Sequence, residues 1–214
     1  MQQQTTKMNK PFAAIIALLA WGSVIAQLWV NLHSGAASTG ELIIRFFSYF
    51  TVLCNIAVAI CCSMVLLKPG TNFFAKPTAL TAVTVYIAIV GIVYNTILRW
   101  LWNPTGIQKI LDDLLHVWVP ILFVVYWILM VPKNNLQWKN AFPWLCFPLI
   151  YCIYVLLRGA FSGFYPYPFM NVTELGYRKV LINSAAVCGT FLFVSFLLIT
   201  IAKWTSKPAE KKPA

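Results

Sequence analysis

Charged residues are scarce in this sequence, and acidic residues are the scarcest. Of 214 residues only 10% are charged, and Asp and Glu together number 5 against 16 Lys and Arg. Soluble domains contain roughly 25% charged and about 45–50% apolar residues, whereas 60% of this chain is hydrophobic. So few charges exclude an ordinary soluble enzyme or a nucleic-acid-binding module. The sequence predicts a membrane protein.

Metal-ligand patterns are also lacking. The 2 histidines, His33 and His116, are far apart, and none of the 6 cysteines belongs to a CxxC motif or a Cys/His cluster. We therefore expect no metal and no cofactor. All six cysteines fall in apolar segments, where we expect buried free thiols acting as small hydrophobic residues: Cys54, Cys61, Cys62, Cys146, Cys152 and Cys188.

Apolar blocks of about 20 residues, the length at which a helix crosses a bilayer, recur along the chain. We expect an all-α polytopic protein with six transmembrane helices joined mostly by short connections. The expected ranges are 12–30, 42–67, 78–98, 111–131, 141–157 and 180–202. Residues 1–203 would form a single transmembrane domain, and residues 204–214, rich in Lys, Pro and Ala, a disordered basic cytoplasmic tail.

The net charge of +11 is explained by membrane topology without a nucleic-acid partner. One side of the spans holds ten cations and one acid, a net charge of +9, and the other holds six cations and four acids, a net charge of +2. Because Lys and Arg concentrate on the cytoplasmic side, both termini are expected there. The first block runs apolar for about 19 residues with no small-residue cleavage site, which favours a retained helix. A bacterial inner membrane is the expected location.

Polar side chains inside the second block are candidates for function, because each is costly in hydrocarbon unless it faces protein or water. In RFFSYFTVLCN, the side chains of Arg45, Ser48, Thr51 and Asn55 fall within an arc of about 120° on a continuous helix and would face the bundle interior. The alternative is that the hydroxyl groups only pack between helices and bond to their own backbone.

The fourth block opens with LDDLLHVWVP, in which Asp112 and Asp113 precede His116 by one helical turn. A carboxylate beside a histidine fixes its tautomer, as a general base requires, and Pro120 would kink the helix and make room for a pocket. From the rise per residue, Thr51 and His116 lie about 10 and 8 Å below the outer boundary. They could therefore form a nucleophile and a base. Alternatively, His116 only bonds a polar neighbour while both aspartates are solvated.

A second candidate group consists of arginines near the outer ends of three spans: Arg45, Arg99 and Arg158. Converging guanidinium groups would hold an anionic head group or a free carboxylate, and Asn95 would line the same cavity. Alternatively, the arginines snorkel to the interface and pair with Glu41 or with the aspartates at 112–113. Asn183 and Ser184 could also face the cavity.

The outer loop of residues 158–179 contains GFYPYPFMN, in which aromatic residues alternate with proline. Such a loop is stiff and amphipathic, lies at the membrane interface and could cover a pocket. Together with residues after the third span, it would contribute to an aromatic belt at the outer interface formed by Trp100, Trp102, Trp118, Tyr165 and Tyr167.

Three of the sequence motifs, together with the six spans, resemble those of a known membrane protein family. A six-span chain with SYFTVLCN, LLHVWVP and YPYPF resembles the androgen-induced and androgen-dependent integral membrane protein family and its bacterial six-helix relatives, over residues 12–203. In eukaryotic members an intramembrane threonine and a histidine hydrolyse fatty acid esters of hydroxy fatty acids. The resemblance maps that pair onto Thr51 and His116. The residues LCN after Thr51 and DD before His116 resemble the bacterial branch.

The resemblance implies a threonine-dependent lipid ester hydrolase whose substrate is a membrane lipid or fatty acyl ester. Asp112 or Asp113 would orient the imidazole, the arginines would hold a substrate carboxylate, and Asn55 or Asn95 would donate to the oxyanion. Two other classes stay open: a small transporter, and a non-enzymatic lipid-binding regulator. An enzyme needs the hydroxyl of Thr51, whereas the other two would tolerate valine.

Overall fold

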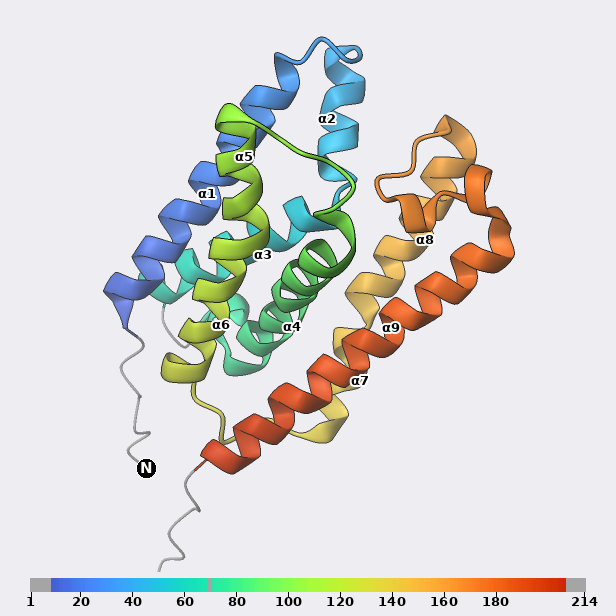
Figure 1. Cartoon of the computed structure of the whole chain (residues 1–214). Coiled ribbons are helices and arrows are strands. Elements are labelled where there is room, and N and C mark those ends of the chain that lie inside the picture. The colour runs from blue at the N-terminus through green and yellow to red at the C-terminus, as the bar shows by residue number, and fades with distance from the viewer. Residues whose placement is uncertain (1–8, 69–70, 207–214) are drawn as a thin grey trace, which may run out of the picture.

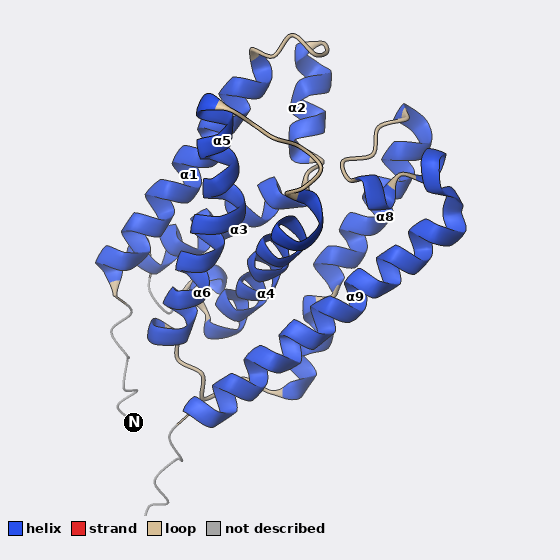
Figure 2. Cartoon of the chain, viewed as in Figure 1, coloured by secondary structure: helices blue, strands red, loops and turns tan. Residues whose placement is uncertain are grey.

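A computed structural model describes residues 9–68 and 71–206, and this part of the chain consists of helices joined by loops, without strands (Figures 1 and 2). Six helical segments are long and apolar enough to cross a membrane: Lys10–Leu32, Phe50–Leu67, Pro77–Leu98, Gly106–Met130, Trp138–Ser162 and Val172–Thr205. The protein is an all-α, multi-pass integral membrane protein, as predicted. The expected disordered tail falls almost wholly on residues 207–214, outside the described residues.

The α-helices are α1 (Lys10–Leu32), α2 (Thr39–Phe47), α3 (Phe50–Leu67), α4 (Pro77–Val93), α5 (Gly106–Asp113), α6 (Val119–Met130), α7 (Ala141–Trp144), α8 (Cys146–Ser162) and α9 (Val172–Thr205). Two π-helical turns continue α4 and α5, namely η2 (Tyr94–Leu98) and η3 (Leu114–Trp118). Three short 3-10 turns lie between helices: η1 (Phe73–Ala75), η4 (Trp138–Asn140) and η5 (Pro168–Met170).

Helix α3 is central to the bundle. It packs along α1 and against α4, while α4 also contacts α6 and α9 (Figure 1). The α1 side of this contact contains buried alanines, among them Ala13 and Ala20, and small residues let helix backbones approach closely in a membrane. Helix α8 packs mainly on α7 and α9. Helices α8 and α9 therefore form a hairpin beside the α1–α6 bundle.

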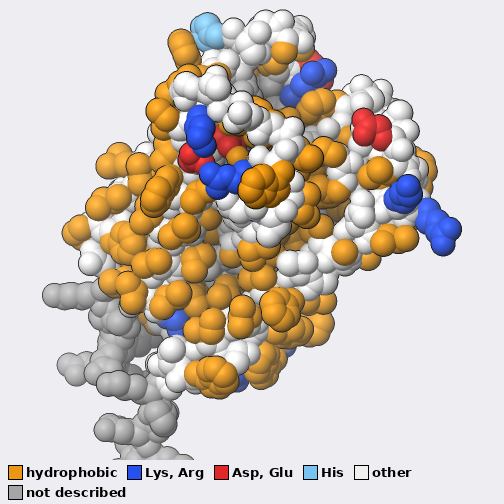
Figure 3. All heavy atoms as spheres, viewed as in Figure 1, with side chains coloured by type: hydrophobic (Ala, Val, Ile, Leu, Met, Phe, Trp, Pro, Cys, Tyr) orange, Lys and Arg blue, Asp and Glu red, His pale blue; other side chains and the backbone are white. Residues whose placement is uncertain are grey.

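Hydrophobic side chains cover most of the outer surface, as Figure 3 shows for one face. Leu18 is 74% exposed and Phe161 is 90% exposed, which fits contact with lipid. Helix α1 begins and α9 ends at the same end of the bundle, the lower end in Figure 1. The described lysines next to that end are Lys10, Lys68, Lys76, Lys133, Lys139 and Lys203. This arrangement matches the expected charge asymmetry between the two sides.

The second expected span is not one helix, which corrects our prediction for residues 42–67. Helix α2 ends at Phe47, and Tyr49 is extended (φ −84°, ψ 124°) before α3 begins. Three hydroxyl groups hold the break: Ser48 Oγ donates to the Ile44 carbonyl at 2.7 Å, Tyr151 donates to the Ser48 carbonyl at 2.8 Å, and the hydroxyl of Tyr154 lies 2.9 Å from Ser48 Oγ. Ser48 therefore has a structural role here.

Two later spans begin or end differently from the predicted ranges. Helix α8 continues to Ser162, and α9 begins at Val172, eight residues before the expected 180, with a bend at Gly176 (φ 73°, ψ 156°). The hydropathy pattern misses the start of α9 because its first turns are polar.

The expectation of six buried thiols is only partly right, although all six cysteines are free. Cys54, Cys61 and Cys62 are buried, whereas Cys146 is exposed and Cys152 and Cys188 are half-buried. Cys146 begins α8, in the part of the chain packed least tightly against the bundle, and the last two line a cavity described below.

Candidate active site

Pro120 shapes the helix that carries His116. A proline has no N–H, so the carbonyl four residues earlier, that of His116, loses its helical partner. The chain forms the π turn η3, in which the N–H of Val119 donates to Leu114, and the carbonyl of Leu115 is released as well. Pro120 was expected to kink this helix. The structure shows instead a π turn, and the two carbonyl groups that it releases are those of Leu115 and His116.

Two asparagines bind these released carbonyl groups. Asn55 Nδ2 donates to the Leu115 carbonyl at 3.1 Å and to the Thr51 carbonyl at 2.8 Å. Asn95 Nδ2 donates to the His116 carbonyl at 3.4 Å and to the Gly91 carbonyl at 2.8 Å. Each amide group thus uses both of its hydrogens on backbone, which corrects the prediction that Asn55 or Asn95 supplies an oxyanion donor.

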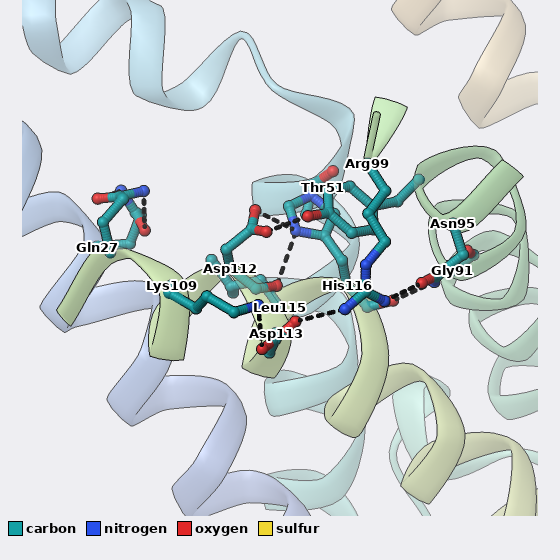
Figure 4. A network of polar contacts seen from close by, with 12 residues as sticks. Gln27, Thr51, Gly91, Asn95, Arg99, Lys109, Asp112, Asp113, Leu115 and His116 are labelled. Atoms are coloured by element: carbon teal, nitrogen blue, oxygen red, sulfur yellow. Dashed lines mark hydrogen bonds and ion pairs between the residues drawn. The ribbon is translucent and has the colours of Figure 1, made fainter. Parts of the chain in front are cut away.

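The imidazole of His116 is held on two sides (Figure 4). Its Nδ1 lies 3.1 Å from Asp112 Oδ1 and 2.9 Å from the Asp112 carbonyl. The ring stacks on Tyr94 with centroids 4.0 Å apart, and the Tyr94 hydroxyl donates to the other carboxylate oxygen of Asp112. Both Asp112 oxygens near Nδ1 are acceptors, which favours the tautomer with the proton on Nδ1 and leaves Nε2 as the nitrogen that can accept a proton.

Of the two adjacent aspartates, only Asp112 orients the histidine. Asp112 is 2% exposed, whereas Asp113 faces the surface and pairs with Arg99 at 3.3 Å and Lys109 at 3.1 Å. Figure 4 shows the two carboxylates pointing to different partners. The residue spacing alone left this choice open.

Thr51 lies at the start of α3, directly after the break. Its side chain is buried, and its N–H belongs to the first helical turn, where no partner exists within the helix. That N–H donates to the hydroxyl oxygen of Tyr167 at 3.3 Å, and the same oxygen lies 3.4 Å from Thr51 Oγ1. Thr51 Oγ1 therefore lies at the positive end of a helix dipole beside a tyrosine hydroxyl.

Two cavities meet at Thr51. The first, of about 600 Å³, is almost wholly apolar and lies between α4 and the α8–α9 hairpin. The second, of about 570 Å³, lies toward α1 and α5 and is lined by polar groups that include His116 and Asp112. Four residues line both: Thr51, Tyr94, Leu98 and Tyr167. The structure therefore brings the Thr51 hydroxyl and the His116 imidazole, which sequence analysis paired, to the wall of one cavity.

The three arginines do not gather at one binding site, contrary to the first expectation: Arg45 and Arg158 meet at Glu41, and Arg99 lies apart from them. Arg45 Nε and a terminal nitrogen of Arg158 share one oxygen of Glu41 at 2.7 and 2.9 Å, and both guanidinium groups lie over the Phe164 ring. Arg99 instead belongs to the network of Figure 4, where it donates to Asn95 at 2.8 Å. Among the described residues that line the two cavities there is no arginine. The alternative prediction, that the arginines form ion pairs with Glu41 or an aspartate, is the one that the structure confirms.

Outside the spans, the shifted pKa values of Glu41 and Tyr167 bear on the site. The hydrogen bond from Arg45, together with the charge of Arg158, lowers the pKa of Glu41 below its ordinary 4.5. Burial raises the pKa of Tyr167 to about 12. The Tyr167 hydroxyl therefore keeps its proton at neutral pH and can donate it to a hydrogen bond.

Several residues were missed or placed differently by sequence reasoning. Tyr167 was expected in the aromatic belt but is buried against Thr51, while Trp100 is 79% exposed as a belt residue would be. Gln27 lies inside the first apolar span and is buried in the polar cavity wall, so the rule that singled out Asn55 could have found it. Nothing in the sequence pattern distinguished Tyr94 from other aromatic residues.

The remaining candidates have structural positions. Asn183 Nδ2 donates to the Phe169 carbonyl at 2.9 Å and so anchors the outer loop on α9. Ser184 lines the apolar cavity, where the Cys152 thiol donates to it at 3.6 Å. His33 lies in an exposed turn with Nδ1 2.8 Å from the Trp29 carbonyl.

Within residues 9–68 and 71–206, no three His, Cys, Asp or Glu side chains gather in a way that could hold a metal ion. Comparisons with protein-family models, with curated proteins and with solved structures gave no match to the chain.

Proposed function

We propose that this protein is an integral membrane lipid ester hydrolase with Thr51 as nucleophile and His116 as general base. The observation that carries the proposal is the meeting of an apolar and a polar cavity at a buried threonine, with an aspartate-held histidine in the polar one. A lipid ester also has two parts that meet at one point: an apolar acyl chain and a second group, joined at the ester carbonyl. The acyl chain fits the apolar cavity, the second group fits the polar cavity, and the carbonyl would then lie at Thr51. Fatty acid esters of hydroxy fatty acids, or related acyl lipids, are the proposed substrates.

The resemblance to the androgen-induced and androgen-dependent family supports the proposal, and we propose membership of its bacterial six-helix branch. The protein would lie in a bacterial inner membrane with its lysine-rich end in the cytoplasm, since lysines gather at one end of the bundle. The site then lies toward the outer leaflet, where a lipid substrate enters sideways from the membrane.

The chemistry uses groups in these positions. His116 Nε2 takes the proton from Thr51 Oγ1 as the oxygen attacks the ester carbonyl carbon and forms a tetrahedral oxyanion. The bond to the leaving oxygen breaks as Nε2 returns the proton to it, which leaves an acyl-threonine and a free alcohol. Water, deprotonated by the same nitrogen, attacks the acyl carbon, and the proton passes to Thr51 as the fatty acid leaves.

Charge on the oxyanion is stabilised by the start of α3 and by Tyr167. The positive end of the helix dipole favours negative charge in the first turn. The Tyr167 oxygen accepts the N–H of Thr51 through a lone pair, so its own O–H stays available to donate to an oxyanion formed at Thr51. The break between α2 and α3, which the sequence did not predict, thus creates the donor end that this scheme requires.

The decisive experiment compares matched variants of the purified protein. Thr51→Val removes the hydroxyl with little change of shape, and Thr84→Val is its control, because Thr84 is buried and bonds only to the Leu80 carbonyl at 2.7 Å. His116→Ala is paired with His33→Ala in the same way. We expect Thr51→Val and His116→Ala to lose ester turnover by about 10³-fold or more, and to lose labelling by a fluorophosphonate, while the controls keep both.

Unchanged turnover in Thr51→Val would sink the hydrolase proposal. A lipid-binding regulator is the second candidate, favoured by the size of the apolar cavity, which at about 600 Å³ lies within the usual range for ligand sites. That function would appear as binding of a fluorescent fatty acid that both threonine variants retain, without hydrolysis by the wild type.

A further inference from the structure

We infer that the polar cavity receives a neutral, hydroxyl-bearing alcohol, so that the preferred substrate is an acyl ester of glycerol or a similar polyol rather than of an anionic hydroxy acid. The inference rests on the proposed function and, among the acyl lipids proposed there, favours polyol esters over fatty acid esters of hydroxy fatty acids. It is drawn from the kinds of side chains that line the cavity and from the charges around them.

Neutral amides form the side of the polar cavity away from Thr51. Gln27 of α1 and Gln108 of α5 exchange hydrogen bonds: Gln27 Nε2 donates to Gln108 at 3.3 Å, and Gln108 Nε2 donates to Gln27 at 3.2 Å. Gln27 also donates to Asn31 at 2.8 Å, and Ser34 completes this part of the lining. Both hydrogens of Gln27 Nε2 are used in these bonds. The groups left for an alcohol hydroxyl are the amide N–H groups of Asn31, the second N–H of Gln108 and the lone pairs of the amide oxygens, which donate and accept as that hydroxyl requires.

Charge in the cavity disfavours an anion. Of the described residues that line it, Asp112 is the only one with a carboxylate, and none is a lysine or an arginine. The nearby cations already have partners, since Arg99 and Lys109 pair with Asp113. A carboxylate or phosphate on the leaving group would therefore meet like charge without a compensating cation.

The apolar cavity would hold the acyl chain of such a substrate. Its lining comes from the faces of α4, α8 and α9, including Val90, Leu149 and Leu181, and its polar groups are few. Leu149 and Leu181 are 47% and 56% exposed, so this lining continues to the lipid-facing surface. An acyl chain can therefore enter from the bilayer while its alcohol reaches the amides past Thr51.

The test compares three oleate esters that differ only in the alcohol: monooleoylglycerol, ethyl oleate and 12-(oleoyloxy)stearate, in which the hydroxy acid keeps its free carboxylate. Wild-type protein should show a higher kcat/KM for the glycerol ester than for the hydroxy-acid ester. The double variant Gln27→Leu with Gln108→Leu replaces both members of the amide pair, so neither is left without the other. Asn31, which loses its bond from Gln27, is only half-buried. We expect it to lower the ratio of kcat/KM for the glycerol ester to that for the ethyl ester by about ten- to a hundredfold.

Gln137→Leu is the control, because Gln137 is exposed near the opposite end of the bundle and should leave the ratio unchanged. The inference is overturned if the hydroxy-acid ester is the best substrate, or if the double variant leaves the ratio within about twofold of the wild-type value. Binding of 1-O-oleylglycerol, an ether that cannot be hydrolysed, is measured alongside. If no ester is turned over, the proposed function fails, and weaker ether binding by the double variant would still support a polyol site, whereas equal binding would refute it.

Discussion

Replacing Asp112 with asparagine separates two carboxylates that the sequence could not distinguish. Asp112 is 2% exposed and binds His116 Nδ1 at 3.1 Å, so its carboxylate keeps the proton on Nδ1 and leaves Nε2 basic. An asparagine in the same place removes the negative charge that stabilises the imidazolium. Its amide can also donate to Nδ1 and so compete with the Asp112 backbone carbonyl, which lies 2.9 Å from Nδ1. Both effects weaken His116 as the base for Thr51.

The size of the effect follows from the role of this bond. The equivalent substitution in a Ser–His–Asp triad lowers kcat by about 10⁴-fold, which corresponds to about 5.5 kcal/mol at 1.36 kcal/mol per decade. Asp113→Asn is the matched control, because Asp113 is partly exposed and bonds Arg99 and Lys109. Surface ion pairs contribute about 0.2–1 kcal/mol each to stability, so this variant should keep its activity within about threefold.

The assay is kcat on a fluorogenic oleate ester in one detergent, with the midpoint of thermal unfolding measured for each variant. A folded Asp112→Asn protein with activity within tenfold of wild type would contradict the assigned role of the carboxylate. Equal losses in Asp112→Asn and Asp113→Asn would show that the effect is a general loss of negative charge near the site.

Three further perturbations test other parts of the structure. Tyr167→Phe should lower kcat by about 10²- to 10³-fold with little change in KM, since it removes the proposed oxyanion donor; a change confined to KM would contradict that role. Asn55→Leu leaves the Leu115 carbonyl without its donor and should destabilise the bundle by about 1–2 kcal/mol in reversible detergent unfolding, and an unchanged midpoint would argue against its bridging contact. Because Arg45 lowers the pKa of Glu41 below 4.5, this ion pair should stabilise the fold fully above pH 4.5 and progressively less as the pH falls through the lowered value. Glu41→Gln should remove that part of the acid dependence of the unfolding temperature, and an identical pH profile would refute the assignment.

The sequence predicts the architecture well because hydrophobic length is a property of each segment by itself. Five of the six spans were placed within a few residues of a long helix, or within its bounds, from block length alone. The same reasoning selected Thr51 and His116, since a polar side chain in an apolar block stands out wherever its partners lie. Both line one cavity in the structure.

The details of the site could not be predicted, because they depend on contacts between segments far apart in the sequence, and a local sequence pattern does not indicate such contacts. The break before Thr51 has no glycine or proline to mark it and is held by Tyr151 and Tyr154, about a hundred residues later. Tyr167 reaches Thr51 only because its loop folds back over the bundle. The choice between the two aspartates depends on a π turn and on Tyr94, which belongs to another helix.

The break between α2 and α3 has a consequence for biogenesis. The Ser48 carbonyl accepts from Tyr151 and the Ser48 hydroxyl contacts Tyr154, and both tyrosines belong to α8, which is synthesised about a hundred residues later. Until α8 is inserted, this stretch lacks those bonds, and an unbroken helix across residues 42–67 would satisfy its backbone better in lipid. The break at residues 48–49 and the Thr51–Tyr167 contact beside it therefore gain their hydrogen-bond partners only when the α8–α9 hairpin and the loop within it are in place.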